Sequence, residues 1–253
     1  MSIESSKVAL VTGAGSGVGR SVALALFQHG YRVALLGRRL EPLIETVNMA
    51  RVQSNAYLVK SCDISIHKQV QEAFSEIGAK FSRLDLLFNN AGIGARAVPI
   101  DELSVDEWQT VVDINLTGCF LCAREAVSLM KQQQPIGGRI INNGSISAHT
   151  PRLFSVPYTS TKHVITGLTK SLALEGRGHR ISCGQIDIGN AATPMTKRME
   201  TGVLQADGSS AVESTMNVEN VAKAVLYMDS LPLEESVLFM TVMANQMPFV
   251  GRG

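Results

Sequence analysis

Tyr158 and Lys162 form the pair of side chains in this sequence best suited to moving a proton. They lie four positions apart, so a helix over this stretch would bring both to one face. Pro157 suits the first turn of such a helix, where its missing N–H leaves no hydrogen bond unmade. A phenol keeps its proton up to about pH 10, and an ammonium a few ångströms away favours the phenolate. The pair could therefore act as a general acid/base, although the same spacing also fits two side chains that merely extend to solvent.

The elements that would have to position this pair alternate between strands and helices. Short apolar runs with the character of buried parallel strands are separated by amphipathic segments. We expect strands over 7–12, 31–36, 55–60, 84–88, 138–142, 179–186 and 237–242, the last at the sheet edge. We expect helices over 18–30 and 40–53, a third helix that ends at about 80, and two helices within 101–130. Two more are expected over 158–175 and 217–228, with Asn217 as the cap of the last.

A glycine-rich turn follows the first strand and reads Thr12-Gly13-Ala14-Gly15-Ser16-Gly17-Val18-Gly19. Glycines let the backbone turn sharply and approach a pyrophosphate closely. The helix that starts there offers unpaired N–H groups and a positive dipole end to the phosphates. Strand, turn, helix and strand together form the unit that binds dinucleotides. A turn needed only for packing is the alternative.

Five motifs in order resemble the classical short-chain dehydrogenase/reductase family over about residues 5–245. They are the TGxxxGxG spacing at Thr12–Gly19, Asn89-Asn90-Ala91-Gly92, Asp113-Ile114-Asn115-Leu116, Ser145 thirteen residues before Tyr158, and Tyr158-x-x-x-Lys162. The resemblance implies an α/β fold, a single-domain Rossmann-type doubly wound sheet of about seven parallel strands with helices on both faces. It also implies reversible hydride transfer between a nicotinamide and a carbonyl or secondary alcohol substrate.

The resemblance assigns catalytic roles to Asn115, Ser145, Tyr158 and Lys162. Ser145 would bond the substrate oxygen and Tyr158 would donate the proton as hydride arrives. Lys162 would hold the ribose hydroxyls, and Asn115 would hold a water bonded to Lys162. Ser147 is the alternative pocket hydroxyl, and the nearby His149 is expected to be structural.

The implied cofactor contacts are Gly13, Gly15, Ser16, Gly17, Val18, Gly19, Arg38, Arg39, Asp63, Ile64, Asn90, Ala91, Gly92, Tyr158, Lys162, Ile188, Gly189, Ala191 and Thr193. No carboxylate stands at the end of the second strand to bond a ribose 2′-hydroxyl. Arg38 and Arg39 stand there instead, and an arginine fork matches a phosphate. We therefore expect NADP, with NAD as the alternative because Ser16 stands where NADP-preferring relatives often carry a basic residue. The two arginines could also be a solvated pair.

Two further regions leave alternatives open. Asp63 is expected at the adenine amino group, or else Asp63 or Ser65 caps the following helix. The family pattern Pro-Gly-x-Val-x-Thr is matched only at Gly189 and Thr193; Ile188 replaces the proline and Ala191 the valine, so the path of this loop is open.

The substrate side is expected to be built from loops. The polar segment 194–215 is typical of an active-site lid, and its neighbours Met195, Met199 and Met216 suggest an adaptable wall. The loops 94–100 and 149–154 would complete the pocket. The resemblance implies a homodimer or homotetramer, and the tail 247–253 is a candidate cover for a neighbouring subunit's site.

Composition excludes several other classes of protein. The chain has 253 residues, 45% hydrophobic and 18% charged, with a net charge of +1 and no linker-like stretch, so we expect one domain over 1–253. A charge near zero argues against nucleic acid and anionic membranes as partners. No run approaches the ~18 apolar residues that span a bilayer, and Met1–Lys7 does not read as a secretory leader, so a cytoplasmic protein is expected.

The cysteines and the remaining function classes complete the sequence-based picture. Cys119 and Cys122 form a lone Cys-x-x-Cys in an apolar helical context, so buried reduced thiols are expected rather than a metal site. Two alternatives to an active reductase stay open. One is a catalytically silent cofactor-binding scaffold, and the other is a dehydratase or epimerase that retains its nicotinamide.

Overall fold

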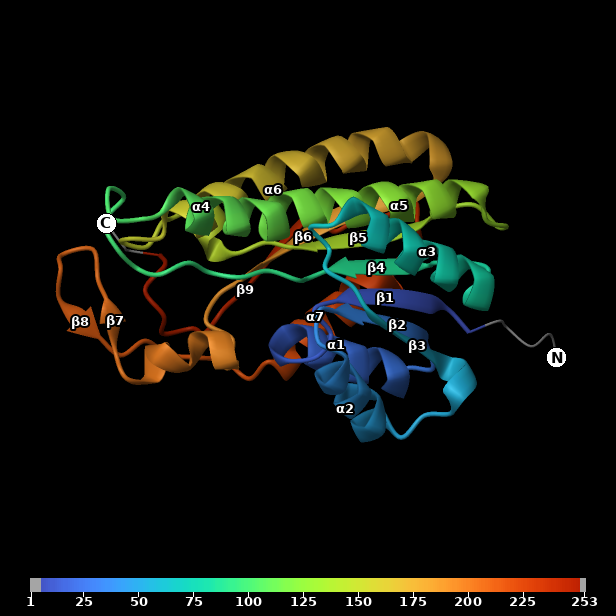
Figure 1. The fold of residues 1–253 in the computed structure, drawn as a ribbon, viewed down its shortest axis with the longest axis horizontal. Helices are drawn as coiled ribbons and strands as arrows, with labels where there is room; N and C mark the ends of the chain where they lie inside the picture. The colour runs from blue at the N-terminus through green and yellow to red at the C-terminus, as the bar shows by residue number, and fades with distance from the viewer. Residues whose placement is uncertain (1–5, 251–253) are drawn as a thin grey trace.

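Seven parallel strands form one sheet with helices on both faces in the computed structural model, which describes residues 6–250 (Figure 1). The strand order is β3-β2-β1-β4-β5-β6-β9. The strands are β1 Val8–Thr12, β2 Arg32–Gly37, β3 Tyr57–Ser61, β4 Leu86–Asn89, β5 Gly138–Asn143, β6 Ile181–Ile188 and β9 Phe239–Val242. The order reverses between β1 and β4, and such a reversal opens a crevice at the carboxyl ends of the strands. The predicted fold class and the edge position of the last strand are confirmed.

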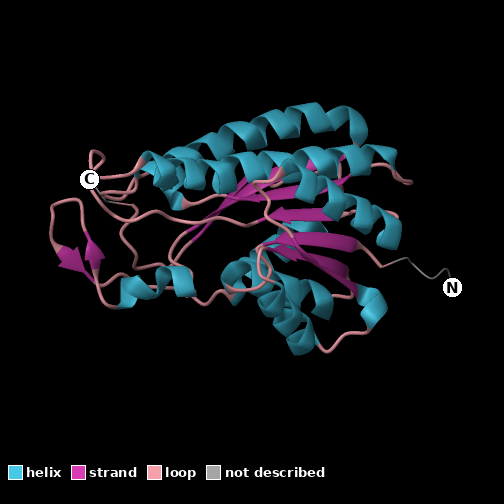
Figure 2. Ribbon diagram, viewed as in Figure 1, coloured by secondary structure: helices cyan, strands magenta, loops and turns pink. Residues whose placement is uncertain are grey.

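The helices form two layers, one on each face of the sheet (Figure 2). One layer contains α1 Gly17–Gln28, α2 Leu40–Ala50 and α7 Glu219–Ser230. The other contains α3 His67–Phe81, α4 Val105–Val112, α5 Cys119–Gln132 and α6 Val156–Glu175. Strands β1, β4 and β6 are buried along their whole length, as a sheet covered on both faces requires.

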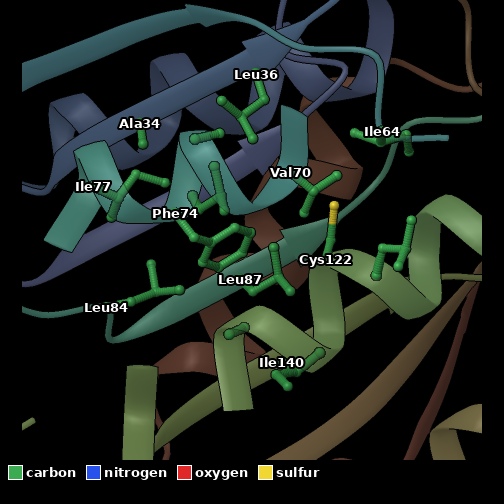
Figure 3. Close-up of a cluster of buried hydrophobic side chains, with 14 of the residues drawn as sticks. Ala34, Leu36, Ile64, Val70, Phe74, Ile77, Leu84, Leu87, Cys122 and Ile140 are labelled. Carbon is green, nitrogen blue, oxygen red and sulfur yellow. The ribbon is translucent and has the colours of Figure 1, made fainter. Parts of the chain in front are cut away.

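Alternate residues along each strand supply the two cores. Figure 3 shows the core under α3 and α5, where Phe74 and Ile77 pack against Leu87 and Ile140. Cys122 belongs to this core, and all four cysteines are buried and unpaired. Burial raises the pKa of the Cys119 thiol to about 12, which keeps it protonated.

Several predicted boundaries are wrong by a few residues. Residues 176–179 form a 3-10 turn after α6, so β6 starts at Ile181 rather than 179. The strand also ends later than predicted, at Ile188 rather than 186. The second helix stops at Ala50 rather than 53 because Arg51 adopts a left-handed conformation. The predicted cap of α7 is off by one position: Val218 is the N-cap, and Asn217 before it accepts a side-chain hydrogen bond from the Glu219 N–H at 2.9 Å.

Two segments contain more regular structure than the sequence indicated. The two helices expected within 101–130 are joined by a π-helical turn, Asp113–Gly118, which contains Asn115 and connects α4 to α5 without interrupting the helix. The expected lid, 194–215, contains a 3-10 helix, Pro194–Glu200, and a hairpin of β7 Val203–Leu204 and β8 Ser210–Ala211.

The two ends of the chain are described only in part. The leader prediction falls mostly on residues 1–5, and the end of the tail, 251–253, also lies outside the described residues. Within the described part, Met247 is buried beside Ile146 and Ala244 of the same chain. Along 6–250, none of the helices combines the length and the apolar character needed to cross a membrane.

Candidate active site

Helix α6 holds Tyr158 and Lys162 on one face, as their spacing predicted. The helix starts at Val156 with Pro157 in its first turn. Lys162 Nζ lies 5.5 Å from the centre of the Tyr158 ring. It donates a hydrogen bond of 2.6 Å to the Asn143 carbonyl at the end of β5, and only 5% of Lys162 is exposed. The ammonium is therefore fixed beside the phenol instead of extending to solvent.

Two cavities meet at Tyr158. The first has a volume of about 270 Å³ and lies at the carboxyl ends of the strands. Its lining includes Gly13, Ser16, Gly17, Val18, Gly19, Arg38, Asp63, Ile64, Asn90, Ala91, Gly92, Tyr158, Lys162 and Thr193. The second has a volume of about 320 Å³, and its lining includes Ser145, Ser147, Tyr158, Ile188, Gly189 and part of the 194–215 segment. Tyr158 and Met195 line both cavities, and of these two only Tyr158 can exchange a proton.

The glycine turn under the first cavity has no room for side chains. Gly13 and Gly17 adopt φ values of +67° and +51°, which L side chains rarely adopt. A Cβ on Gly19 would lie 2.2 Å from the Gly13 carbonyl oxygen. The backbone at the start of α1 is thus open toward the cavity, which fits a dinucleotide pyrophosphate docked on the helix N-terminus.

Thr12 joins this turn to the Asn-Asn-Ala-Gly motif. Its hydroxyl accepts hydrogen bonds from the N–H groups of Asn90 and Ala91 at 2.8 and 2.9 Å. The Asn90 amide donates back to the Thr12 carbonyl at 2.8 Å. In the sequence Thr12 stands out only as part of a motif, and the signal for its role is a hydroxyl residue at the end of a buried strand.

The remaining implied cofactor residues lie in three different places. Arg38 lines the first cavity, whereas Arg39 precedes α2 and does not. Gly15 packs against Pro42, and Ala191 is buried in a bridge to Met216; neither residue lines the first or the second cavity. Ile188 ends β6, and with Gly189 it faces the second cavity.

Asp63 lines the first cavity and also closes a local turn. Its Oδ1 accepts hydrogen bonds from the N–H and the hydroxyl of Ser65 at 3.0 and 2.7 Å. Helix α3 begins at His67, after Ile66, without a side-chain cap. The alternative in which Asp63 or Ser65 caps this helix is therefore wrong.

Asn115 connects the loop after β4 to α6, the helix that carries Tyr158 and Lys162. Its side-chain oxygen accepts from the Ile93 N–H at 2.8 Å, and its amide donates to the Ile93 carbonyl at 2.9 Å. The same amide reaches the Thr161 hydroxyl at 3.3 Å, next to Lys162. The π-helical turn thus aims a buried amide at the loop after β4 and at α6.

Ser145 lies two residues after the end of β5 and lines the second cavity. Its hydroxyl oxygen accepts the Ser147 N–H at 3.1 Å, and its own N–H donates to Asp187 Oδ1 at 3.1 Å. Asp187 Oδ2 is 2.7 Å from His149 Nε2. Asp187 was not expected from the sequence, where its signal is a single charged residue in a buried strand.

Arg152, which lines the second cavity, forms an ion pair with Glu213 of a distant segment. Both terminal guanidinium nitrogens of Arg152, Nη1 and Nη2, donate to Glu213 at 2.7 and 2.5 Å, and the Asn190 amide donates to Glu213 at 2.8 Å. Burial acts to raise the pKa of Glu213, but the hydrogen bonds from Arg152 and Asn190 outweigh it and lower the pKa to about 2.

Comparison with known proteins places these features in a family. The family model of short chain dehydrogenases matches residues 7–203. The chain is 36% identical over 197 residues to a 3β-hydroxysteroid dehydrogenase from Mediterraneibacter gnavus, covering 78% of this chain and 70% of the relative. It is 32% identical over 225 residues to a mitochondrial borneol dehydrogenase from Lavandula x intermedia, covering 88% and 83%.

Solved structures agree with this assignment. A 3-ketoacyl-(acyl-carrier-protein) reductase from Brucella melitensis complexed with NADH has a TM-score of 0.84 at 25% identity, over 95% of this chain and 98% of that one. An actinorhodin polyketide ketoreductase with NADPH has a TM-score of 0.84 at 26% identity, over 96% and 97%. With the family model spanning most of its length, the chain belongs to the short-chain dehydrogenase/reductase family, the NAD(P)-dependent oxidoreductases that act on alcohol and carbonyl groups.

Proposed function

We propose that this protein is an NADP(H)-linked reductase of a carbonyl substrate, with Tyr158 as the general acid/base. The observation that carries the proposal is the position of Tyr158. Its side chain lines both the cavity above the glycine turn and the cavity beside Ser145, and the buried Lys162 ammonium lies next to its ring. A proton donor at this junction can reach a carbonyl in one cavity while a nicotinamide occupies the other.

The first cavity supports a phosphate-bearing dinucleotide. When bound, NADPH supplies the hydride. The open backbone at Gly13, Gly17 and Gly19 would hold the pyrophosphate, and Arg38 would bind the 2′-phosphate. Lys162 uses one N–H on the Asn143 carbonyl, which leaves two N–H donors for ribose hydroxyls.

The second cavity supports a carbonyl held against Ser145 and Tyr158. The Ser147 backbone N–H donates to one lone pair of the Ser145 hydroxyl oxygen. The Ser145 O–H therefore remains able to donate to a carbonyl oxygen. Tyr158 would then transfer its proton to that oxygen as hydride reaches the carbon. Asn115, next to Thr161 and the catalytic helix, would connect Lys162 to solvent through a water.

The wall of the second cavity favours a substrate with an apolar body. It includes Ile146, Leu153, Phe154, Met195, Met199 and Leu204. The two dehydrogenases compared above are named for 3β-hydroxysteroid and borneol, both apolar polycyclic alcohols. We therefore propose ketones of alicyclic compounds as the first substrates to screen.

The decisive experiment is NADPH oxidation with a ketone panel, comparing the wild type with Tyr158→Phe. The phenylalanine keeps the ring beside Lys162 but cannot donate a proton, so we expect turnover to fall by about 10³-fold or more. NADPH binding, followed by nucleotide fluorescence, should change little. Turnover that survives the substitution would refute Tyr158 as the acid, and a wild type that binds NADPH but reduces no compound would favour the silent scaffold.

A further inference from the structure

Asp187 is a buried carboxylate placed directly beneath the loop that carries Ser145. It is 1% exposed and stands second to last in β6. Oδ1 accepts the Ser145 N–H at 3.1 Å and the Gln185 side-chain amide at 2.7 Å. Oδ2 is bonded to His149 Nε2 at 2.7 Å, and the His149 side chain is 45% exposed. Three donors, two from the loop after β5 and one from β6 itself, thus converge on this carboxylate.

The neighbouring Gly144 shows how closely the loop rests on this carboxylate. A Cβ at Gly144 would lie 2.1 Å from Asp187 Oδ1 and 2.7 Å from the Gln185 amide nitrogen. The Gly144 N–H also donates to the Ile186 carbonyl at 2.9 Å, which continues the β5–β6 pairing into the loop. Only glycine leaves room for this contact, so the position of Ser145 depends on what β6 presents below it.

The same network reaches the helix that carries Tyr158. The Gln185 amide, which donates to Asp187, is also 3.2 Å from the Thr166 hydroxyl on α6. Thr166 lies two helical turns beyond Tyr158. Asp187 therefore links the loop of Ser145 to α6, the two elements that must hold a substrate oxygen between a serine and a tyrosine.

We propose that Asp187 is a positioning residue that fixes Ser145 for carbonyl polarisation, with His149 holding the carboxylate from the solvent side. The inference rests on the proposed function, since it assigns Asp187 an effect that acts through Ser145. Burying a carboxylate is costly unless it is fully hydrogen-bonded, so packing alone would be served better by an uncharged residue. A hydrogen bond from a backbone N–H to a carboxylate is strong and directional, and a donor misplaced by even a fraction of an ångström loses its effect on the transition state.

The test is a double-mutant cycle on the best ketone, with Asp187→Ala, Ser145→Ala and the double variant. Each protein is measured for kcat, KM, the Kd for NADPH and the melting temperature. We expect Asp187→Ala to lower kcat about tenfold, the loss expected when one charge-assisted hydrogen bond is removed, without weakening NADPH binding. In the Ser145→Ala background the same substitution should have no further effect on kcat, because the residue it positions is gone.

Asp229→Ala is the matched control. Asp229 is a similarly buried carboxylate, held by Tyr31 and Lys7 at the opposite end of the sheet. The Asp229→Ala substitution should lower the melting temperature without changing kcat. An unchanged kcat in Asp187→Ala would overturn the inference, and so would an equal loss with and without Ser145. If Ser145→Ala alone keeps full activity, the proposed mechanism itself fails, which separates the two outcomes.

His149 provides a second route if Asp187→Ala does not fold. His149→Ala removes the contact to Oδ2 from a half-exposed position, while His149→Gln can still donate to it. We expect a loss of kcat in the alanine variant, recovery in the glutamine variant, and no loss in either when Ser145 is alanine. Equal kcat in all of these variants and the wild type would overturn the role of His149.

Discussion

Arg152 and Glu213 form a two-point ion pair that joins the loop after β5 to the end of the 194–215 segment. The Glu213 side chain is almost fully buried, and Asn190 and Gln205 also donate to it. The pair holds the segment that supplies Met195, Met199 and Leu204 to the second cavity. The shape of the substrate pocket therefore depends on this contact.

Glu213→Gln should loosen this segment and destabilise the protein. We expect a loss of about 1–3 kcal/mol, since Arg152 keeps an acceptor but loses its counter-charge. KM for the ketone should rise more than kcat falls. Thermal melting and steady-state kinetics measure both effects, and Glu234→Gln is the control because Glu234 forms an exposed ion pair with Arg180. Equal effects of the two variants would contradict the prediction.

The contribution of Glu213 should also depend on pH. Its pKa is lowered from 4.5 to about 2, so the folded state binds this proton less readily than the unfolded chain. The stabilisation is then complete above about pH 4.5 and is lost as the pH falls toward 2. The difference in melting temperature between wild type and Glu213→Gln should shrink between pH 6 and pH 3, and a constant difference would argue against an ionised Glu213.

Gly19→Ala should abolish cofactor binding. The added Cβ would lie 2.2 Å from the Gly13 carbonyl oxygen and must displace the turn. We expect the Kd for NADPH to rise by about 100-fold or more, because the phosphate-binding backbone no longer has its geometry. Gly167→Ala on α6 is the control: a Cβ there meets no atom within 4 Å. It should stabilise the helix by about 0.5–1 kcal/mol and leave binding unchanged.

Arg38 and Arg39 offer a matched pair for the cofactor preference. Arg38 lines the first cavity and Arg39 does not. Arg38→Ala should lower kcat/KM for NADPH by about 10–100-fold and leave the value for NADH almost unchanged, since only NADPH carries the 2′-phosphate. Arg39→Ala should change neither value by more than about twofold. A wild type that prefers NADH would show that Arg38 does not bind the 2′-phosphate of NADPH.

The predicted homodimer or homotetramer can be tested on helices α5 and α6. Phe120 and Val164 are each 48% exposed, and Leu174 is 62% exposed. Apolar side chains of this size on adjacent helices favour association. We expect light scattering to give a mass of two or four chains, and Phe120→Glu with Val164→Glu to lower it. A monomeric wild type at micromolar concentration would contradict the expectation.

Much of the fold could be predicted because buried parallel strands appear as continuous apolar runs between glycine turns. The pairing of Tyr158 with Lys162 could be predicted as well, because both lie on one helix. The contact between Arg152 and Glu213 could not, since the two residues are 61 positions apart and neither segment shows a periodic pattern. The start of β6 was placed two residues too early because His179 belongs to the 3-10 turn that follows α6. Asp187 was passed over because its partners Ser145 and His149 lie about 40 positions away in the loop after β5.

The π-helical turn at Asp113–Gly118 has a consequence for everything that follows it in the chain. A π turn contains one residue more than an α turn, so it offsets the angular phase of α5 relative to α4 by about 100°. Cys122, Ala126 and Met130 point into the core only with that offset in place. Removing a single residue from this turn would restore an ordinary helix and rotate this apolar stripe away from the sheet, so a one-residue deletion here should be far more damaging than one in a surface loop.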